Sequence, residues 1–232
     1  MLALPSFPPA FQLVAVDREV AAFARAVGAA PRGIEDGTIF WAARDDLLDM
    51  ALVLEPETPA AVESVYLLAV AACDALARLV APDASVACAW PGDLLLGGAR
   101  VGGLRAAIAP TADTTAPPPW LVLGLCLQLA EVAGEAPDRT SLARHGAGAV
   151  GAAALLDTIS RRFLHWAGRQ RTDGPASIDA AWNGRCHRRG EQGVLVLGGK
   201  RIAGTIHGVD GGGRFAIGQH RLSLTDALGL LA

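Results

Sequence analysis

Lysine is almost absent from this chain, in which Lys200 is the single lysine beside 19 arginines. Chemistry that depends on a lysine amine therefore has no candidate in residues 1–184. Alanine and glycine are abundant in the same sequence, so a general replacement of lysine by arginine explains part of this absence. Arginine carries the same charge, but it does not give up its proton in a protein.

Other absences narrow the class of protein. No apolar run approaches the roughly 18 residues that span a bilayer, and the first residues lack the basic region of a secretory signal. The four cysteines have no Cys-x-x-Cys spacing and the five histidines have no ligand-like spacing, so we expect reduced thiols and no metal site. These features predict a soluble, cytoplasmic protein without a membrane partner.

The charges are distributed unevenly around a net charge of −3. Residues 1–184 contain 13 arginines and 20 acidic residues, whereas residues 185–232 contain seven basic and three acidic residues. Nucleic-acid-binding domains usually concentrate basic residues in one stripe, so this modest excess argues against a nucleic-acid partner. Because 52% of the residues are hydrophobic and only 19% are charged, we expect a well-packed core.

Hydrophobic periodicity predicts an α+β protein with a small second domain. We expect domain boundaries at 1–175 and 176–232, because a Gly-Pro-containing linker at 172–175 precedes short strands with glycine turns. That second domain has the pattern of a small β-barrel. Helices are predicted at 17–27, 59–80, 150–171 and 177–182, and main-domain strands at 38–41, 47–54, 86–89, 94–96, 99–101 and 120–129.

The stretch from residue 89 to residue 104, AWPGDLLLGGARVGGL, is the most informative part of the chain. Gly97-Gly98 predicts a two-residue hairpin turn, because glycine reaches the positive φ that primed turns require. Gly102 and Gly103 follow on the returning strand, where the backbone can approach a ligand with no side chain in the way.

This stretch resembles the core of the biotin and lipoate protein ligase superfamily, in which Lys-Trp-Pro-Asn-Asp precedes a hairpin that ends in a basic residue and a glycine. The resemblance implies a mixed or antiparallel sheet with packed helices, followed by an SH3-like β-barrel. It also implies ligation of biotin or lipoate to a protein lysine. The implied ligands are a small carboxylic acid and ATP or AMP, and the implied partner is a biotinyl or lipoyl carrier protein.

Three further segments resemble the same superfamily. Residues 123–129 resemble its Gly-Ile-Gly-Ile-Asn-Val strand, with Cys126 at the second glycine and Gln128 at the asparagine. Thr140-Ser141-Leu142 resembles its Thr-Ser-Leu, although a helix N-cap explains these residues better. Residues 206–213 resemble the Gly-Ile-Asp-x-x-Gly turn of the C-terminal barrel.

The departures from the family pattern fall on its catalytic residues. Ala89 replaces the lysine before Trp-Pro, and Arg100 replaces the lysine of the returning strand. The arginine-rich, glycine-rich loop that grips the acyl-adenylate corresponds to residues 38–46, a short acidic turn whose one arginine is Arg44. We therefore predict no acyl-adenylate formation. Two functions remain open: a divergent ligase, and a non-catalytic module that binds a ligand or a protein.

The resemblance assigns a set of site residues. Arg100 takes the place of the catalytic lysine, with Asp93 as its expected partner across the hairpin; a purely structural ion pair is the alternative. Strand alternation places Arg100 and Arg105 on opposite faces, so one of them faces the pocket unless a β-bulge resets the alternation. The predicted ligand-binding residues are Trp90, Asp93, Gly102, Gly103, Arg105, Gly124 and Gln128.

Several of these residues also have simpler explanations. Trp90 is equally consistent with a core aromatic residue beneath the hairpin. The amide of Gln128 needs a hydrogen-bond partner in an apolar strand, either a ligand or the backbone. Cys88 and Cys126 alternate with large apolar residues, as core cysteines do, which argues against covalent catalysis. A free sheet edge is compatible with a homodimer.

Overall fold

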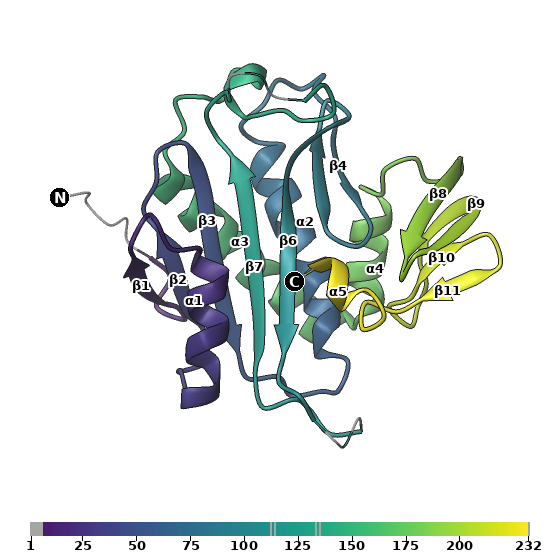
Figure 1. The fold of residues 1–232 in the computed structure, drawn as a ribbon, viewed down its shortest axis with the longest axis horizontal. Coiled ribbons are helices and arrows are strands. Elements are labelled where there is room, and N and C mark those ends of the chain that lie inside the picture. The colour runs from purple at the N-terminus through teal and green to yellow at the C-terminus, as the bar shows by residue number, and fades with distance from the viewer. Residues whose placement is uncertain (1–6, 112, 114, 133, 135, 232) are drawn as a thin grey trace.

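The structure is a computed structural model that describes residues 7–111, 113, 115–132, 134 and 136–231. A large sheet stands in the middle, with α1 (Ala22–Ala29) in front of it and α2 (Ser64–Leu76) and α3 (Ala152–Asp173) behind it (Figure 1). The predicted α+β class is therefore confirmed, and helices α2 and α3 lie on one face of the sheet as expected.

Seven strands form this sheet in the order β1-β2-β3-β7-β6-β5-β4. Only β1 and β2 pair in parallel, so the sheet is mixed. The first strand lies before every helix and strand that the sequence predicted. The strand bounds are β1 Gln12–Val16, β2 Thr38–Ala42, β3 Leu47–Leu54, β4 Val86–Ala89, β5 Asp93–Leu96, β6 Ala99–Ile108 and β7 Leu121–Gln128.

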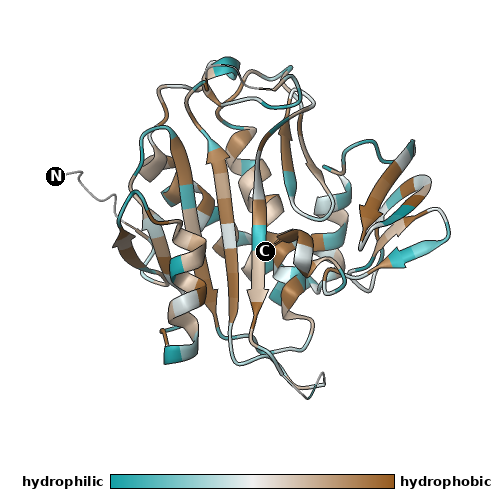
Figure 2. Ribbon diagram, in the orientation of Figure 1, coloured by the Kyte–Doolittle hydropathy of each residue, from teal (hydrophilic) through white to brown (hydrophobic). Residues whose placement is uncertain are grey.

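Helix α2 is apolar around almost its whole circumference and is nearly all buried. Such a helix needs neighbours on every side, and α2 has the sheet on one side and α3 and α4 (Ala176–Asn183) on the others. It is shorter than the predicted 59–80, because a 3₁₀ turn, Ala61–Glu63, precedes it. The central strands β3 and β7 are coloured mainly as hydrophobic in Figure 2, in agreement with their burial.

The hairpin between β5 and β6 has the predicted two-residue turn, with φ of 61° at Gly97 and 84° at Gly98. Strand β6 does not stop at its glycine pair but continues to Ile108, and its later part pairs with β7. The hairpin is therefore joined directly to the centre of the sheet.

On the outer face of the sheet, helix α1 packs mainly on β2, β3 and β7. Phe23 and Ala26 of this helix form a second apolar cluster with Phe40 and Val122. The helix begins at Ala22 rather than at residue 17, because a turn comes first, in which the Val20 N–H donates to the Asp17 carbonyl at 2.9 Å. The short C-terminal α5 (Leu228–Leu231) lies near Gly92 and Leu104, and Arg105 of β6 contacts Phe23 of α1.

The C-terminal part is a four-stranded antiparallel sheet, in the order β11-β10-β9-β8. Its Phe215 and Ile217 belong to the same apolar core as Trp182 of α4. The linker predicted at 172–175 is reduced to Gly174 and Pro175, because α3 extends to Asp173. The SH3-like barrel and the domain boundaries stay predictions. The bounds are β8 Gln192–Leu197, β9 Lys200–Val209, β10 Phe215–Ile217 and β11 His220–Leu222.

Among the residues that the structure describes, no helix is both long and apolar enough to cross a membrane.

Candidate functional site

A hollow of about 310 Å³ opens on the outer face of the sheet, beside β6 and β7. We call it the cationic pocket, because three arginines line it and none of its lining residues is acidic. The lining residues that matter most for its chemistry are Arg100, Gly103, Arg105, Cys126, Gln128 and Arg139.

Two further hollows extend the cationic pocket into a groove. The first, of about 260 Å³, lies beside α1 and shares Leu47, Arg105 and Cys126 with the cationic pocket. The second, of about 520 Å³, lies at the turn between β2 and β3 and shares Arg18, Glu19 and Arg44 with the first. The groove thus connects the hairpin glycines with the turn between β2 and β3, where the resemblance predicts the adenylate loop.

A β-bulge places both predicted arginines on this groove. Leu94 pairs with Gly102 but Leu95 pairs with Arg100, so Val101 is an extra residue in β6. Val101 is buried in the core, and the alternation restarts after it. The bulge that could reset the alternation is therefore present, and both arginines line the pocket.

Arg100 makes the predicted ion pair with Asp93. The distance between Arg100 Nε and Asp93 Oδ1 is 2.7 Å, and the two side chains are 43% and 46% exposed. The arginine lies across Gly103, where an added Cβ would be 2.8 Å from Arg100 Nη2. Glycine at position 103 therefore leaves room for the guanidinium at the mouth of the pocket.

The other two glycines of the site are required by the packing of the protein itself. An added Cβ at Gly102 would collide with the carbonyl oxygen of Cys126 on the neighbouring strand. At Gly124 it would lie 2.7 Å from Cδ2 of Phe23, the residue of α1 that covers it. The neighbouring backbone thus explains Gly102 and the Phe23 ring explains Gly124, and a ligand contact at either glycine stays a prediction.

Arg105 and Arg139 complete the cationic pocket. The Arg105 guanidinium lies 5.8 Å from the centre of the Phe23 ring. Arg139 is in a segment that pairs with the start of β6: Arg100 N–H donates to the Asp138 carbonyl at 2.8 Å, and Thr140 N–H donates to the Arg100 carbonyl at 2.9 Å. Among the described residues, neither arginine has a carboxylate oxygen within 4.0 Å.

Cys126 also faces the groove, which corrects its interpretation as a core cysteine. Its neighbours Leu125 and Leu127 point into the core, so strand alternation sends Cys126 to the outer face. Burial, with a smaller contribution from the charge of Asp49, raises the pKa of the Cys126 thiol to about 11. The thiol is neutral near pH 7, and this protonation state disfavours a nucleophilic role.

Gln128 has the partner that its position in an apolar strand requires. Its Nε2 donates to the backbone carbonyls of Asp46, at 3.1 Å, and Ala130, at 3.0 Å. The backbone alternative is thus confirmed. The side-chain oxygen receives no hydrogen bond from the described residues, so it is left as an acceptor at the pocket.

Two predicted site residues do not line the groove: Asp93, which meets it only through the ion pair with Arg100, and Trp90. Trp90 is 6% exposed, and its Nε1 donates to the Tyr66 hydroxyl at 3.1 Å. Its ring stacks on Phe215 at a centroid distance of 5.1 Å. Trp90 therefore joins the hairpin to α2 and to the C-terminal sheet from inside the core.

Arg139 is the residue of the pocket that the sequence did not indicate. The nearby Thr140-Ser141-Leu142 drew attention to this segment, but no periodicity connects Arg139 with β6. Ser141 acts partly as the alternative predicted, since its Oγ accepts from the Arg144 N–H at 3.4 Å beside a short 3₁₀ turn, Ala143–His145.

The single arginine of the turn between β2 and β3 forms an ion pair within that turn. Arg44 Nη2 lies 2.7 Å from Asp46 Oδ2. The hydrogen bond to Arg44 lowers the pKa of the Asp46 carboxyl, and the same contact raises the pKa of Arg44. The positive charge of Arg44 is thus partly neutralised within the turn itself.

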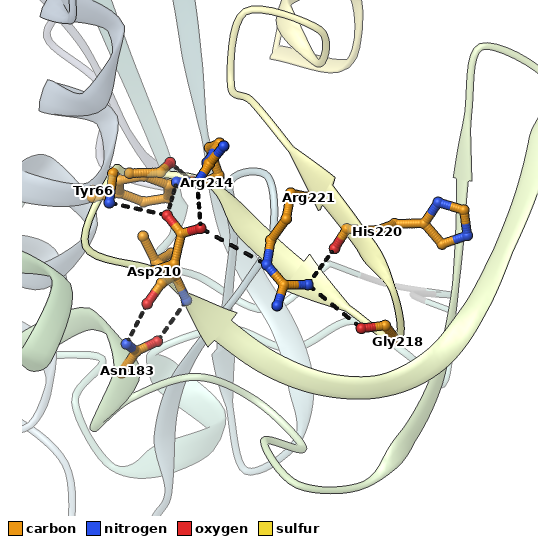
Figure 3. A network of polar contacts seen from close by, with 10 residues as sticks. Tyr66, Asn183, Asp210, Arg214, Gly218, His220 and Arg221 are labelled. Atoms are coloured by element: carbon orange, nitrogen blue, oxygen red, sulfur yellow. Dashed lines mark hydrogen bonds and ion pairs between the residues drawn. The ribbon is translucent and has the colours of Figure 1, made fainter.

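A second charged region lies between the main sheet and the C-terminal sheet, and we call its residues Glu63, Asp179 and Asp210 the carboxyl junction. Burial raises the pKa of Glu63 to about 7 and that of Asp179 to about 6. Figure 3 shows Asp210 between Arg214 and Arg221. No group of three or more metal-ligating side chains is arranged to hold an ion anywhere in the described part of the chain.

Comparisons with known proteins agree with the fold. The sequence model of the biotin/lipoate A/B protein ligase family matches residues 7–184. A biotin–[acetyl-CoA-carboxylase] ligase of Paracoccus denitrificans is 30% identical over 171 residues, which are 70% of this chain and 70% of that protein.

Two solved structures extend the likeness to almost the whole chain. A biotin protein ligase-like protein of unknown function from Silicibacter sp. TM1040 has a TM-score of 0.85 and 33% identity, covering 96% of this chain and 98% of that one. A mutant of the Aquifex aeolicus biotin protein ligase, solved in complex with biotin, has a TM-score of 0.74. Its identity is 15% over 92% of this chain and 96% of that one, so it shows a shared fold.

Proposed function

Because this chain belongs to the biotin/lipoate A/B protein ligase family, we propose that it binds a small carboxylic acid, or an acyl derivative of one, in the groove. The observation that carries this proposal is the position of Arg100, which replaces the family's lysine and lines a pocket without acidic residues. A guanidinium forks onto a carboxylate with two parallel hydrogen bonds.

The residues around Arg100 define how such a ligand binds. Its carboxylate competes with Asp93 for the Arg100 guanidinium, since that ion pair is nearly half exposed. The free side-chain oxygen of Gln128 accepts a hydrogen bond from a polar group of the ligand, while Leu47 supplies an apolar wall. A hydrogen bond to a charged group contributes about 1.5–3 kcal/mol.

The catalytic half of the family's activity is supported less well than binding. Adenylation of a carboxylic acid requires cationic groups on the phosphates of ATP, and Arg44 is paired with Asp46 at the turn where they are expected. Arg100 cannot act as a proton donor in place of a lysine. These residues do not form a site suited to the phosphates of ATP. We therefore propose a ligand-binding member of the family without ATP-dependent adenylation.

A divergent ligase is the second candidate function, and the 30% identity to the Paracoccus denitrificans enzyme favours it. In that case biotin or lipoate is the acid, and the lysine of a biotinyl or lipoyl carrier protein is the acceptor. Four further proposals apply to both candidate functions. We propose a cytoplasmic location, an SH3-like C-terminal barrel and a homodimer formed through a free sheet edge. We also propose that the protein has no nucleic-acid or membrane partner.

Titration calorimetry with hexanoate, biotin and lipoate tests the proposed function. We expect Arg100→Ala to weaken binding of the acid that binds best by roughly ten-fold or more, with the fold retained. Arg78→Ala is the matched control, because it removes an exposed arginine just after α2, behind the sheet. Unchanged binding by the Arg100 variant would show that the groove is not an anion site.

Pyrophosphate exchange with ATP separates the two candidates. The ligand-binding proposal predicts no exchange above background with biotin or lipoate. Clear acid-dependent exchange that Arg100→Ala abolishes and Arg78→Ala retains would instead establish the ligase.

A further inference from the structure

The cationic pocket carries more positive charge than one carboxylate requires. Three arginines line it without an acid among the lining residues, although residues 1–184 contain 20 acidic residues and only 13 arginines. We propose that the ligand carries two anionic groups, the first bound by Arg100 and the second by Arg105 and Arg139. This inference rests on the proposed function and specifies the class of ligand.

The three arginines differ in their counter-ions. Arg100 has Asp93 at 2.7 Å, whereas no carboxylate of the described residues lies within 4.0 Å of Arg105 or Arg139. Arginines with like charge repel each other when they share a hollow, and this repulsion is relieved when an anion enters. Among the described residues, the pocket therefore has one cation with an ion-pair partner and two cations without one.

The two arginines for which the described residues provide no ion-pair partner are held in position by the fold. Arg105 stands on the central part of β6, and its guanidinium lies over the Phe23 ring. Arg139 is fixed by the pairing of its segment with Arg100, through hydrogen bonds of 2.8 and 2.9 Å on either side of it. Because both arginines stand on hydrogen-bonded backbone, the positions of their Cα atoms at the pocket are set before a second anion binds.

The excess of positive charge is confined to one end of the groove. At the turn between β2 and β3, the lining residues Glu19, Asp45 and Asp46 balance Arg18 and Arg44. The groove is thus cationic at the β6 end and balanced at the turn. We place both anionic groups at the β6 end, and the uncharged part of the ligand along Leu47 and Cys126, which both hollows share.

Binding of adipate and hexanoate, measured by titration calorimetry at low ionic strength, tests this inference, because the two acids have the same chain length and differ by one carboxylate. We expect the wild type to bind adipate roughly ten-fold more tightly than hexanoate. Succinate and suberate report the spacing of the two anion positions, and inorganic pyrophosphate reports whether phosphate groups are preferred to carboxylates.

Arg105→Ala and Arg139→Ala should each reduce adipate binding to about the level of hexanoate, while hexanoate binding changes less than about two-fold. Arg139→Lys keeps the charge and should keep much of the preference for adipate. Arg78→Ala should leave the affinity for both acids unchanged. Thermal unfolding of each variant checks that the fold is retained.

The outcomes separate this inference from the proposed function. Equal binding of adipate and hexanoate by the wild type, or an unchanged preference for adipate in both alanine variants, would overturn the second anion position. If Arg100→Ala still weakens the binding of hexanoate in that case, the proposed function stands. Absence of binding by every acid and by pyrophosphate would overturn both.

Discussion

The cationic pocket and the carboxyl junction are both clusters of like charge, but they differ in what the charges face. The arginines of the pocket face a solvent-filled hollow with few counter-ions of their own. The carboxyls of the junction are packed between α2, α4 and the C-terminal sheet, where Glu63 lies against the backbone of Gly213. One cluster is open to a ligand and the other is closed by the fold.

At the carboxyl junction, polar side chains form hydrogen bonds with the backbone of the C-terminal sheet and its turn. The Tyr66 hydroxyl donates to the Gly213 carbonyl at 3.1 Å, and the Asn183 side chain exchanges two hydrogen bonds of 2.7 Å with the backbone of Val209 (Figure 3). Although burial raises the pKa of Asp210, hydrogen bonds from the N–H groups of Arg214 and Gly212 lower it overall. The junction therefore holds the C-terminal sheet on the main core.

The comparison teaches that the position of a charge decides its role. At the junction, removal of a group should change stability without changing ligand binding. At the pocket, removal of a group should change binding with little effect on stability, because exposed cations contribute little to folding.

The largest effect is expected from Trp182→Ala at the junction. Trp182 is 1% exposed, and its ring contacts Tyr66 at 5.5 Å and Phe215 at 6.0 Å between centroids. Loss of a buried aromatic side chain costs about 3–5 kcal/mol of unfolding free energy, which chemical denaturation measures. Trp120→Ala, at a half-buried tryptophan beside α1, should cost less. Loss of hexanoate binding by the folded Trp182 variant would show that the two regions are coupled.

An intermediate effect is expected from pH. Burial, with added repulsion from Asp179 and Asp210, raises the pKa of Glu63 from 4.5 to about 7 in the folded protein. The folded state therefore keeps a proton that the unfolded state releases. The contribution of protonated Glu63 to the free energy of unfolding is complete below about pH 4.5, and it is lost as the pH rises through about 7.

Glu63→Gln should remove this part of the pH dependence. Because Glu63 is only half-buried, we expect the variant to gain on the order of 1 kcal/mol relative to the wild type between about pH 5 and about pH 8. Denaturation curves across this range provide the measurement, with the exposed Glu57→Gln as control. A wild type that becomes more stable over the same range, relative to the variant, would contradict the assignment.

The smallest effect is expected from Asp93→Asn at the pocket. Asp93 competes with a ligand for Arg100, and partly exposed ion pairs contribute about 0.2–1 kcal/mol. The variant should bind hexanoate a few-fold more tightly by calorimetry, and its melting temperature should stay close to that of the wild type. Weaker binding would mean that Asp93 positions Arg100 rather than competing for it.

The sequence by itself determined much of the framework. Apolar runs predicted β3 and β7, and Gly97-Gly98 predicted the hairpin turn, because these signals act over a few neighbouring residues. The resemblance at residues 89–104 identified the family, and the replacement of its lysine by Arg100 is visible without a structure. The pairing of Arg100 with Asp93 also followed from the hairpin, since the two strands are adjacent in the chain.

Only the tertiary structure decided which side chains share the groove. The extra residue Val101 turned Arg100 to the face of Arg105, and the backbone pairing of residues 138–140 brought Arg139 beside them. The same register sent Cys126 outward and left Trp90 inside the core. The physical reason is that a bulge, and the approach of a distant segment, depend on hydrogen bonds between strands, and the periodicity of a single strand carries no information about its partner.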